Sequence, residues 1–208
     1  MNTRIAFDVD GVVLQSIDVI LDYVNVKQGR NLQVNDLTGW DLEPIGLDMQ
    51  TLIEAADFMY SQEFIHPYPG AVEVLEFIHE ITGEPLLFIT GRRRPETALR
   101  QLQQLPWKKT RPKMVVTGGD RDKRSYLQET STAFIIEDDT KYLQDYLNAG
   151  IGVGLMIQPW NRHSLIPVTK RFHGWNDIDR WFKTLLRQEC SGNYSTAIGC
   201  WEGVSLPT

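Results

Sequence analysis

Two acidic residues follow the first strand-like segment of the chain. The short apolar run at residues 4–7 stops at Asp8-Val9-Asp10-Gly11. At the end of a strand, Asp8 is well placed as a nucleophile, because aspartate carboxylates can form phosphoryl–enzyme intermediates. Asp10, two residues further on, can protonate a leaving oxygen and then deprotonate an attacking water. An Asp-Gly pair by itself more often marks a turn, so this interpretation depends on the groups at the other strand ends.

Polar groups of the same kind follow two further apolar runs. Residues 86–89 lead into Thr90-Gly91-Arg92, and residues 133–136 lead into Glu137-Asp138-Asp139. In an open α/β sheet, ligands bind outside the carboxyl ends of the strands, so these side chains should meet on one rim. Close carboxylates resist joint ionisation unless a cation lies between them. Asp8, Asp10 and Asp138 therefore predict a site for Mg²⁺, which prefers hard oxygen ligands.

A phosphate bound at this rim would need hydrogen-bond donors. Thr90, the backbone amide of Gly91 and Lys123 are expected to hold its oxygens. Lys123 lies in a charged stretch between the third and fourth strands, and its neighbour Arg124 competes for the same role. Thr90 could instead cap the helix that follows it. Asp139 is expected to orient a metal-bound water or Lys123.

The segments that must position these groups alternate between strand and helix. Short apolar runs rich in β-branched residues predict strands that are buried on both faces of a parallel sheet. They lie at residues 4–7, 86–89, 114–116, 133–136 and 152–157. Between them apolar residues recur at helical spacing, as do Ala71, Leu75 and Ile78. The alternation predicts an α/β fold with a doubly wound parallel sheet.

The stretch between the first two strands is longer than a crossover needs. A crossover takes about 30 residues, which leaves roughly 45 for an inserted element. Helical patterns at 17–26 and 49–60 make this insertion a small helical cap, and Pro67-Tyr68-Pro69-Gly70 marks the return to the core. A last helix is predicted over 178–186. The predicted division is a core of residues 1–14 and 67–190, a cap of residues 15–66, and a tail of residues 191–208 that is docked or disordered.

These motifs resemble those of a known superfamily. Asp8-Val9-Asp10-Gly11-Val12-Val13 is similar to the signature of the haloacid dehalogenase-like (HAD) hydrolases, and Thr90, Lys123 and Glu137-Asp138-Asp139 match the remaining motifs in order. The resemblance spans residues 4–160 and implies a Rossmann-like core. Dehalogenases of the superfamily lack an acid at the second position and P-type ATPases carry threonine there, so Asp10 implies a phosphatase.

The cap and the Pro69-Gly70-Ala71 sequence narrow the resemblance. A small helical cap after the first strand looks most like the 5′(3′)-deoxyribonucleotidases and their bacterial relatives. This implies a Mg²⁺-dependent phosphomonoesterase that acts through an aspartyl-phosphate, with the metal held by Asp8, the Asp10 carbonyl and Asp138. A nucleoside monophosphate is the expected substrate. The alternatives are another small metabolite, such as a sugar phosphate or phosphoserine, and a non-catalytic binding protein on the same fold.

The substrate candidates are one arginine and two aromatic residues. Arg92 could clamp a second phosphate or a carboxylate. Trp40 and Phe64, in the expected cap, could stack on a nucleobase. A small helical cap also needs aromatic residues for its own core, so the second interpretation competes with the first.

Composition limits the partners. The net charge of −6 argues against a nucleic-acid polymer, whose binding needs excess lysine and arginine, but a bound cation would still admit a small phosphorylated metabolite. The apolar runs are too short to span a membrane. Two cysteines make no disulfide framework, so we expect a cytoplasmic location. The sequence leaves a homodimer open.

Overall fold

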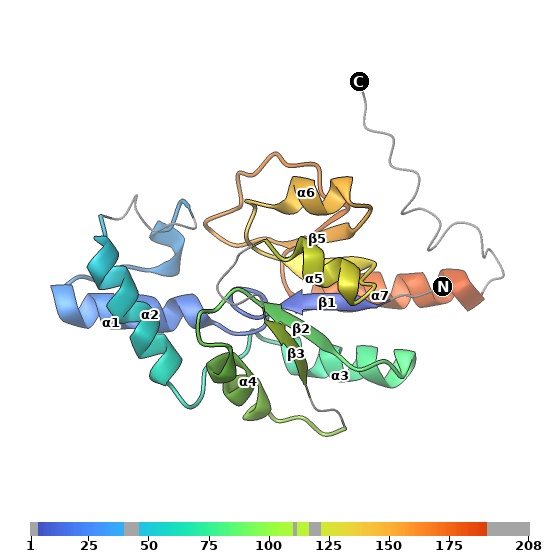
Figure 1. The fold of residues 1–208 in the computed structure, drawn as a ribbon, viewed down its shortest axis with the longest axis horizontal. Helices are drawn as coiled ribbons and strands as arrows, with labels where there is room; N and C mark the ends of the chain where they lie inside the picture. The colour runs from blue at the N-terminus through green and yellow to red at the C-terminus, as the bar shows by residue number, and fades with distance from the viewer. Residues whose placement is uncertain (1–3, 40–45, 110–111, 117–121, 191–208) are drawn as a thin grey trace.

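The computed structural model describes residues 4–39, 46–109, 112–116 and 122–190 (Figure 1). Trp40 and the tail at 191–208 lie outside these described residues. The strands form one parallel sheet in the order β3-β2-β1-β4-β5-β6. Their bounds are β1 Ile5–Asp8, β2 Leu87–Thr90, β3 Lys113–Val116, β4 Phe134–Glu137, β5 Gly152–Met156 and β6 Lys170–Phe172.

This strand order is that of a doubly wound sheet. From β1 the chain moves to one side for β2 and β3, then crosses over β1 to build β4, β5 and β6 on the other side. The direction of winding therefore reverses beside β1, which is where ligands bind in such sheets. The predicted Rossmann-like fold is confirmed. Strand β6 was not predicted, because Lys170 and Arg171 of this short edge strand are polar and break the apolar pattern.

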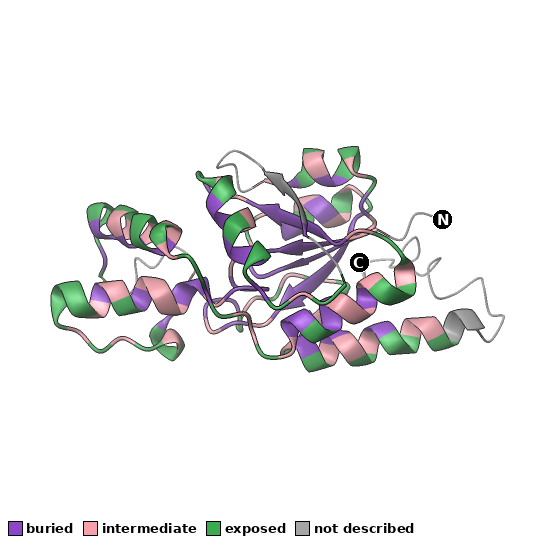
Figure 2. Ribbon diagram, turned by 90° about the horizontal axis from the view of Figure 1, so that it is seen from below, coloured by how far each residue is buried: buried purple, intermediate pink, exposed green. Residues whose placement is uncertain are grey.

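Helices cover both faces of the sheet because strand side chains alternate in direction. Phe7 belongs to a core with residues of α3 (Ala71–Thr82), α4 (Pro95–Gln103) and α7 (Trp175–Cys190). Its neighbour Ala6 belongs to a second core with α5 (Arg124–Glu129) and α6 (Leu143–Asn148). Figure 1 shows α3 and α4 on one side of the strands and α5 and α6 on the other. Figure 2 shows the buried residues gathered in the sheet between these layers.

The segment 15–66, called the cap segment below, stands beside the sheet rather than on a face of it (Figures 1 and 2). It contains α1 (Ser16–Gln28), a 3₁₀ helix η1 (Val34–Asp36) and α2 (Met49–Ser61). Helix α1 ends at Gly29 in the left-handed conformation, and Asp48 caps α2 by accepting from the Thr51 amide at 2.8 Å. Buried side chains of both helices form a cluster separate from the sheet core.

The two connections between the cap segment and the sheet run side by side. The Gln15 amide donates to the His66 carbonyl at 2.9 Å, and the Tyr68 amide donates to the Val13 carbonyl at 2.8 Å. The chain thus leaves the sheet and returns to it at one place, directly after Asp10. Among the described residues, no helix is both long and apolar enough to cross a membrane.

Candidate active site

The strand ends bring the expected polar groups to one rim of the sheet. Asp8 is the last residue of β1, Thr90 the last of β2 and Glu137 the last of β4. Because β1 lies between β2 and β4 and all three are parallel, these ends are neighbours. Lys123, at the start of α5, reaches the same rim with its ammonium group.

Lys123 lies between two carboxylates. Its Nζ is 2.6 Å from Asp8 Oδ1 and 2.6 Å from Glu137 Oε2, and its side chain is only 5% exposed. Burial alone would lower the pKa of Lys123, but the charges of Asp8 and Glu137 outweigh it and raise the pKa, so the ammonium is retained. Arg124, which the sequence analysis considered as an alternative to Lys123 for phosphate binding, is exposed and pairs with Asp122 at 3.2 Å.

Three buried carboxylates lie around the Lys123 ammonium. Asp8, Glu137 and Asp138 each place an oxygen within 4.8 Å of the others. Two unit charges about 5 Å apart repel by about 3 kcal/mol at an effective dielectric constant of about 20. Burial, and then the charge of Glu137, raise the pKa of Asp8 to about 8 despite Lys123. Burial, followed by the charges of Asp8 and Glu137, likewise raises the pKa of Asp138.

The donor set fits a hard divalent cation. Asp138 Oδ1 is buried and has no hydrogen-bond partner among the described residues. A buried carboxylate oxygen without a partner is costly, and an oxygen-preferring cation would satisfy it while relieving the repulsion. This orphan oxygen, together with the adjacent carboxylates of Asp8 and Glu137, is the arrangement that Mg²⁺ suits.

Glu137 is a site residue to which the sequence analysis assigned no role. Its Oε2 accepts from Lys123, while its Oε1 accepts from the amides of Asp138 at 3.1 Å and Asp139 at 3.2 Å. It therefore holds both the ammonium and the turn that carries the next two acids. Its place as the first of three acids at a strand end was the available signal. Glu137 is a member of the buried carboxylate cluster, whereas the side chain of Asp10 is not.

The side chain of Asp10 pairs with Arg92, the residue that the sequence analysis considered as a clamp for a second phosphate or a carboxylate. The guanidinium grips the carboxylate with two bonds, Nε to Oδ2 at 2.7 Å and Nη2 to Oδ1 at 2.6 Å. Ser16 also donates to Asp10, and Arg92 Nη1 donates to Gln101 at 2.6 Å. Arg92 is 4% exposed. It also donates to the hydroxyls of Thr97 and Ser16, each at 3.4 Å, so that all three guanidinium nitrogens make hydrogen bonds. Arg92 is also among the residues that line the cavity described below.

This pairing sets the charge of Asp10. Burial alone would raise its pKa, but the charge of Arg92 and its hydrogen bonds, with the Ser16 bond, lower the pKa below its usual value. In this conformation Asp10 is an ionised carboxylate. It lines the cavity beside Asp8 and is suited to accept a proton.

The phosphate-binding candidates of β2 lie at the same edge. Thr90 is buried, and its Oγ1 accepts from the amide of Arg92 at 3.2 Å. Gly91 lines the cavity above Asp8, as does Asp139, whose Oδ1 accepts from the Lys141 amide at 3.1 Å. The predicted residues of the strand ends are therefore together.

A cavity of about 280 Å³ opens above these groups, between the sheet edge and the cap segment. Its floor carries Asp8, Asp10 and Lys123, and its cap-side wall is mostly aliphatic. The apolar residues of that wall are Ile17, Ile20, Leu52, Ala56 and Met59. Three tyrosines also line the cavity, Tyr60 from the cap segment and Tyr142 and Tyr146 from the sheet side.

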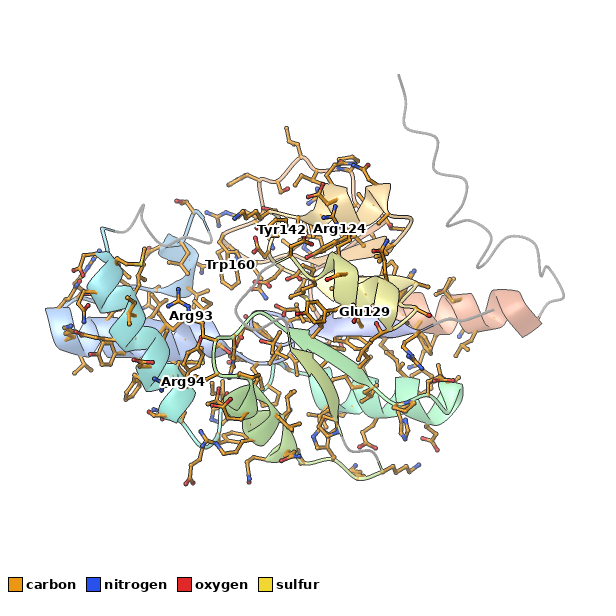
Figure 3. The ribbon with its side chains drawn as sticks, in the orientation of Figure 1. Arg93, Arg94, Arg124, Glu129, Tyr142 and Trp160 are labelled. Carbon is orange, nitrogen blue, oxygen red and sulfur yellow. The ribbon has the colours of Figure 1, made fainter. Side chains whose placement is uncertain are left out.

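Of the two expected stacking residues, Phe64 is not among the described residues that line this cavity. Phe64 is 43% exposed and packs edge-on against His66 with ring centres 5.0 Å apart. Trp40 lies outside the described residues. Figure 3 shows Tyr142 on the sheet side of the molecule. Among the described residues, the aromatic side chains that line the cavity are Tyr60, Tyr142 and Tyr146.

Solved structures share this fold. A haloacid dehalogenase-like family hydrolase from Streptococcus pneumoniae is 15% identical with a TM-score of 0.60, covering 86% of this chain and 98% of its own. CbbY from Rhodobacter sphaeroides, solved in complex with phosphate, is 15% identical with a TM-score of 0.57 and coverages of 86% and 96%. YfnB from Bacillus subtilis, solved with magnesium bound, is 16% identical with a TM-score of 0.55 and coverages of 86% and 97%.

Sequence comparison gives the family. No curated protein matches this chain. Residues 2–188 match the family model for the 5′ nucleotidase, deoxy (pyrimidine), cytosolic type C protein. Because this match covers most of the 208 residues, the chain belongs to that family of HAD-type nucleotidases and is an enzyme of the phosphatase class.

Proposed function

We propose that the protein is a Mg²⁺-dependent phosphomonoesterase that hydrolyses nucleoside monophosphates through an aspartyl-phosphate on Asp8. One observation carries the proposal. Lys123 contacts Asp8 in a buried cluster of three carboxylates, and Asp138 Oδ1 in that cluster lacks a partner among the described residues. A cation and a phosphoryl group are the species that such a cluster is suited to bind.

The chemistry divides between the two aspartates. Asp8 would attack phosphorus through a carboxylate oxygen, forming a P–O bond while the ester P–O bond breaks. Asp10 would give its proton to the leaving alkoxide, and then take a proton from the water that attacks the aspartyl-phosphate. Inorganic phosphate leaves and the Asp8 carboxylate is restored. Lys123, Thr90 and the Gly91 amide would hold the equatorial oxygens.

The Arg92 contact decides when Asp10 can act as an acid. Because Arg92 favours the ionised form, Asp10 is a base in the conformation described. A bound phosphate ester would bring negative charge beside Asp10 and favour its protonation. Entry of the substrate would thus favour the protonated form of Asp10. Transfer of that proton to the leaving alcohol would return Asp10 to its carboxylate form.

The proposed metal ligands are Asp8, the main-chain carbonyl of Asp10 and Asp138, with Asp139 orienting a ligand water. When bound there, Mg²⁺ would neutralise the charge that the carboxylates and the phosphoryl oxygens bring together. Lys123, already paired with Asp8 and Glu137, supplies positive charge at the same place.

The cap segment is proposed to select the leaving group and exclude water. Its aliphatic wall offers no hydrogen bonds from Ile20, Leu52 or Met59, so it suits the flat apolar surface of a nucleobase better than a hydroxyl-rich sugar. The second candidate is a phosphatase for a smaller metabolite. The volume of about 280 Å³ favours it, since that lies at the small end of the usual range for ligand sites.

A substrate screen tests the proposal. Hydrolysis of nucleoside monophosphates, sugar phosphates and phosphoserine is measured with Mg²⁺ and again with EDTA. We expect the highest kcat/KM for nucleoside monophosphates, and loss of activity with EDTA and in Asp8→Asn. Acid quenching should trap a phosphorylated protein that Asp8→Asn does not form. Activity that persists in EDTA would exclude the metal, and a preference for sugar phosphates would favour the second candidate.

A further inference from the structure

Trp160 touches both the proposed metal site and the cap segment. We propose that it is a positioning residue that couples Mg²⁺ binding at Asp138 to the packing of the cap segment against the core. The inference rests on the metal site of the proposed function, and it adds a role for a residue that the sequence analysis assigned to neither catalysis nor binding.

The first contact is to the metal ligand. Trp160 Nε1–H donates to Asp138 Oδ2 at 3.0 Å, and both residues are buried. The other oxygen, Oδ1, has no partner among the described residues. The indole N–H therefore fixes the rotation of the carboxylate and leaves one oxygen for a cation.

The loop that carries Trp160 is anchored to the same strand ends. Asn161 Nδ2 donates to the carbonyls of Asp138 and Met156, each at 2.8 Å, and its Oδ1 accepts from the Gln158 amide at 2.9 Å. Gln158 Nε2 donates to the Gly11 carbonyl at 2.6 Å. The loop that carries the indole is thus hydrogen-bonded to the backbone at Asp138 and at Gly11.

Gly11 closes the remaining space. A Cβ atom at this position, where φ is +77°, would lie 2.2 Å from Asp138 Oδ2 and 3.1 Å from the Trp160 ring. The carboxylate and the indole therefore rest directly against the backbone of the loop after β1. Asp138 cannot turn in that direction, so its orientation depends on the indole N–H.

The second contact is to the cap segment. The Trp160 ring belongs to the buried cluster that α1 and α2 form, and it is the buried member from outside residues 15–66. The cap residues of this cluster are Ile17, Leu21, Val24, Leu37, Leu47 and Ala55. Figure 3 shows Trp160 between the helices of the cap segment and the sheet.

The two contacts make the coupling reciprocal. A cap segment that moves away from the core would uncover the indole and free its N–H from Asp138. A cation that fixes Asp138 would hold the indole where the cap cluster needs it. Linkage requires that each event favour the other by the same factor.

The test uses Trp160→Phe, which keeps an aromatic ring for the cap cluster and removes the N–H. The matched control is Trp107→Phe, because Trp107 Nε1 donates a hydrogen bond too, but to the main-chain carbonyl of Leu102 in α4, at 2.6 Å. Mg²⁺ affinity is measured by isothermal titration calorimetry on the full chain. Loss of a partner of a metal ligand weakens metal binding about 10–100-fold, which we expect for Trp160→Phe and not for Trp107→Phe.

Hydrogen exchange measures the coupling itself, and in the wild-type protein it needs no variant. Mg²⁺ should slow amide exchange in α1 and α2, and Trp160→Phe at saturating Mg²⁺ should lose that protection. Unchanged Mg²⁺ affinity in Trp160→Phe, or exchange in α1 and α2 that is indifferent to Mg²⁺, would overturn the inference alone. Absence of Mg²⁺ binding by the wild-type protein would overturn the proposed metal site, and the inference with it.

Discussion

Lys123 is one positive charge among three buried carboxylates. The ammonium contacts Asp8 and Glu137, while Asp138 lies within the same buried cluster. If all three carboxylates were ionised, the single ammonium would leave an excess of negative charge in a buried site, and this is why the pKa values of Asp8 and Asp138 are raised. Natural proteins accept such costs where a site must bind a charged ligand. The crowding of these carboxylates has a measurable consequence for stability.

The metal-free protein should lose stability as the pH rises. The pKa of Asp8 is raised from 3.8 to about 8, chiefly by burial and then by Glu137. Between about pH 4 and about pH 8 the folded state therefore keeps a proton that the unfolded state has released, so the free energy of unfolding falls across that window. Urea denaturation in EDTA over this range measures the effect.

The control for this prediction is Asp8→Asn, which cannot ionise at that position. Its stability in EDTA should fall less over the same window, so that near pH 8 it exceeds the stability of the wild-type protein. A wild-type stability that is flat, or that rises over the window, would show that Asp8 is ionised throughout and that Lys123 alone satisfies it.

At the scale of elements, Arg92 joins four parts of the fold. It follows β2, grips Asp10 after β1, shares Asp10 with Ser16 at the start of α1, and reaches Gln101 in α4. Gln101 in turn donates to the carbonyls of Met59 at 3.0 Å and Gln62 at 2.8 Å, at the end of α2. Helices α1 and α2 of the cap segment are thus both connected to Asp10 through polar contacts.

We expect Arg92→Met to be strongly destabilising. It would leave the Asp10 carboxylate unpaired in a site where that side chain is only 16% exposed. Removing one partner of a buried ion pair costs about 3–5 kcal/mol, and the partial exposure favours the lower end. The free energy of unfolding from urea denaturation gives the measurement.

The double variant Arg92→Met/Asp10→Asn separates the charge from the packing. If the unpaired carboxylate causes the loss, adding Asp10→Asn should recover most of it. A double variant as unstable as Arg92→Met would assign the loss to the bonds with Gln101 and Thr97 instead. Arg92→Lys, which keeps the charge but not the two parallel bonds, should fall between the wild-type protein and Arg92→Met.

The sequence predicted the position of a site residue where that position depends on neighbouring residues in the chain. Strand-end acids such as Asp8 and Asp138 stand directly after apolar runs, so their place on one rim followed from the sheet rule. The partner of Arg92 is 82 residues away, and nothing in the Arg92-Arg93-Arg94 run distinguishes a buried pair from a substrate clamp. Trp160 likewise acquires its role only when the loop after β5 meets the cap segment.

At the scale of the whole molecule, Mg²⁺ should stabilise the folded chain. The carboxylate cluster exists only when β1 and β4 are adjacent, so the unfolded chain has no such site. A ligand at 100 times its Kd stabilises the state that binds it by about 2.7 kcal/mol. We expect Mg²⁺ to raise Tm, and we expect Asp138→Ala to abolish that rise.

Asp179→Ala is the matched control, because Asp179 pairs with Lys183 on the surface of α7. Its Tm should rise with Mg²⁺ as in the wild-type protein. A Tm of Asp138→Ala that still responds to Mg²⁺ would place the cation elsewhere than at Asp138. This measurement does not depend on knowing the substrate.

Selection of the leaving group is proposed to depend on the whole molecule, because the sheet and the cap segment each supply one side of the cavity. Sequence reasoning placed the stacking rings among the aromatics around the cap, and it could not see that Phe64 would pack on His66. The cavity is lined by one of these cap aromatics, Tyr60 of α2, and by Tyr142 and Tyr146 from the sheet side. Tyr142 makes the cleaner test, since the Tyr60 ring also lies 5.7 Å from the Arg92 guanidinium.

If a nucleobase stacks on Tyr142, Tyr142→Ala should remove about 1–3 kcal/mol of binding. At about 1.4 kcal/mol per tenfold change, this lowers kcat/KM for nucleoside monophosphates by roughly 5- to 150-fold. Glycerol phosphate has no ring to stack, so its kcat/KM should hardly change. The control is Tyr126→Ala, since Tyr126 of α5 packs against the second core and is not among the described residues that line the cavity. Equal losses on both substrates in Tyr142→Ala would mean that the ring supports the phosphate site rather than a base, and would favour a phosphatase of smaller metabolites.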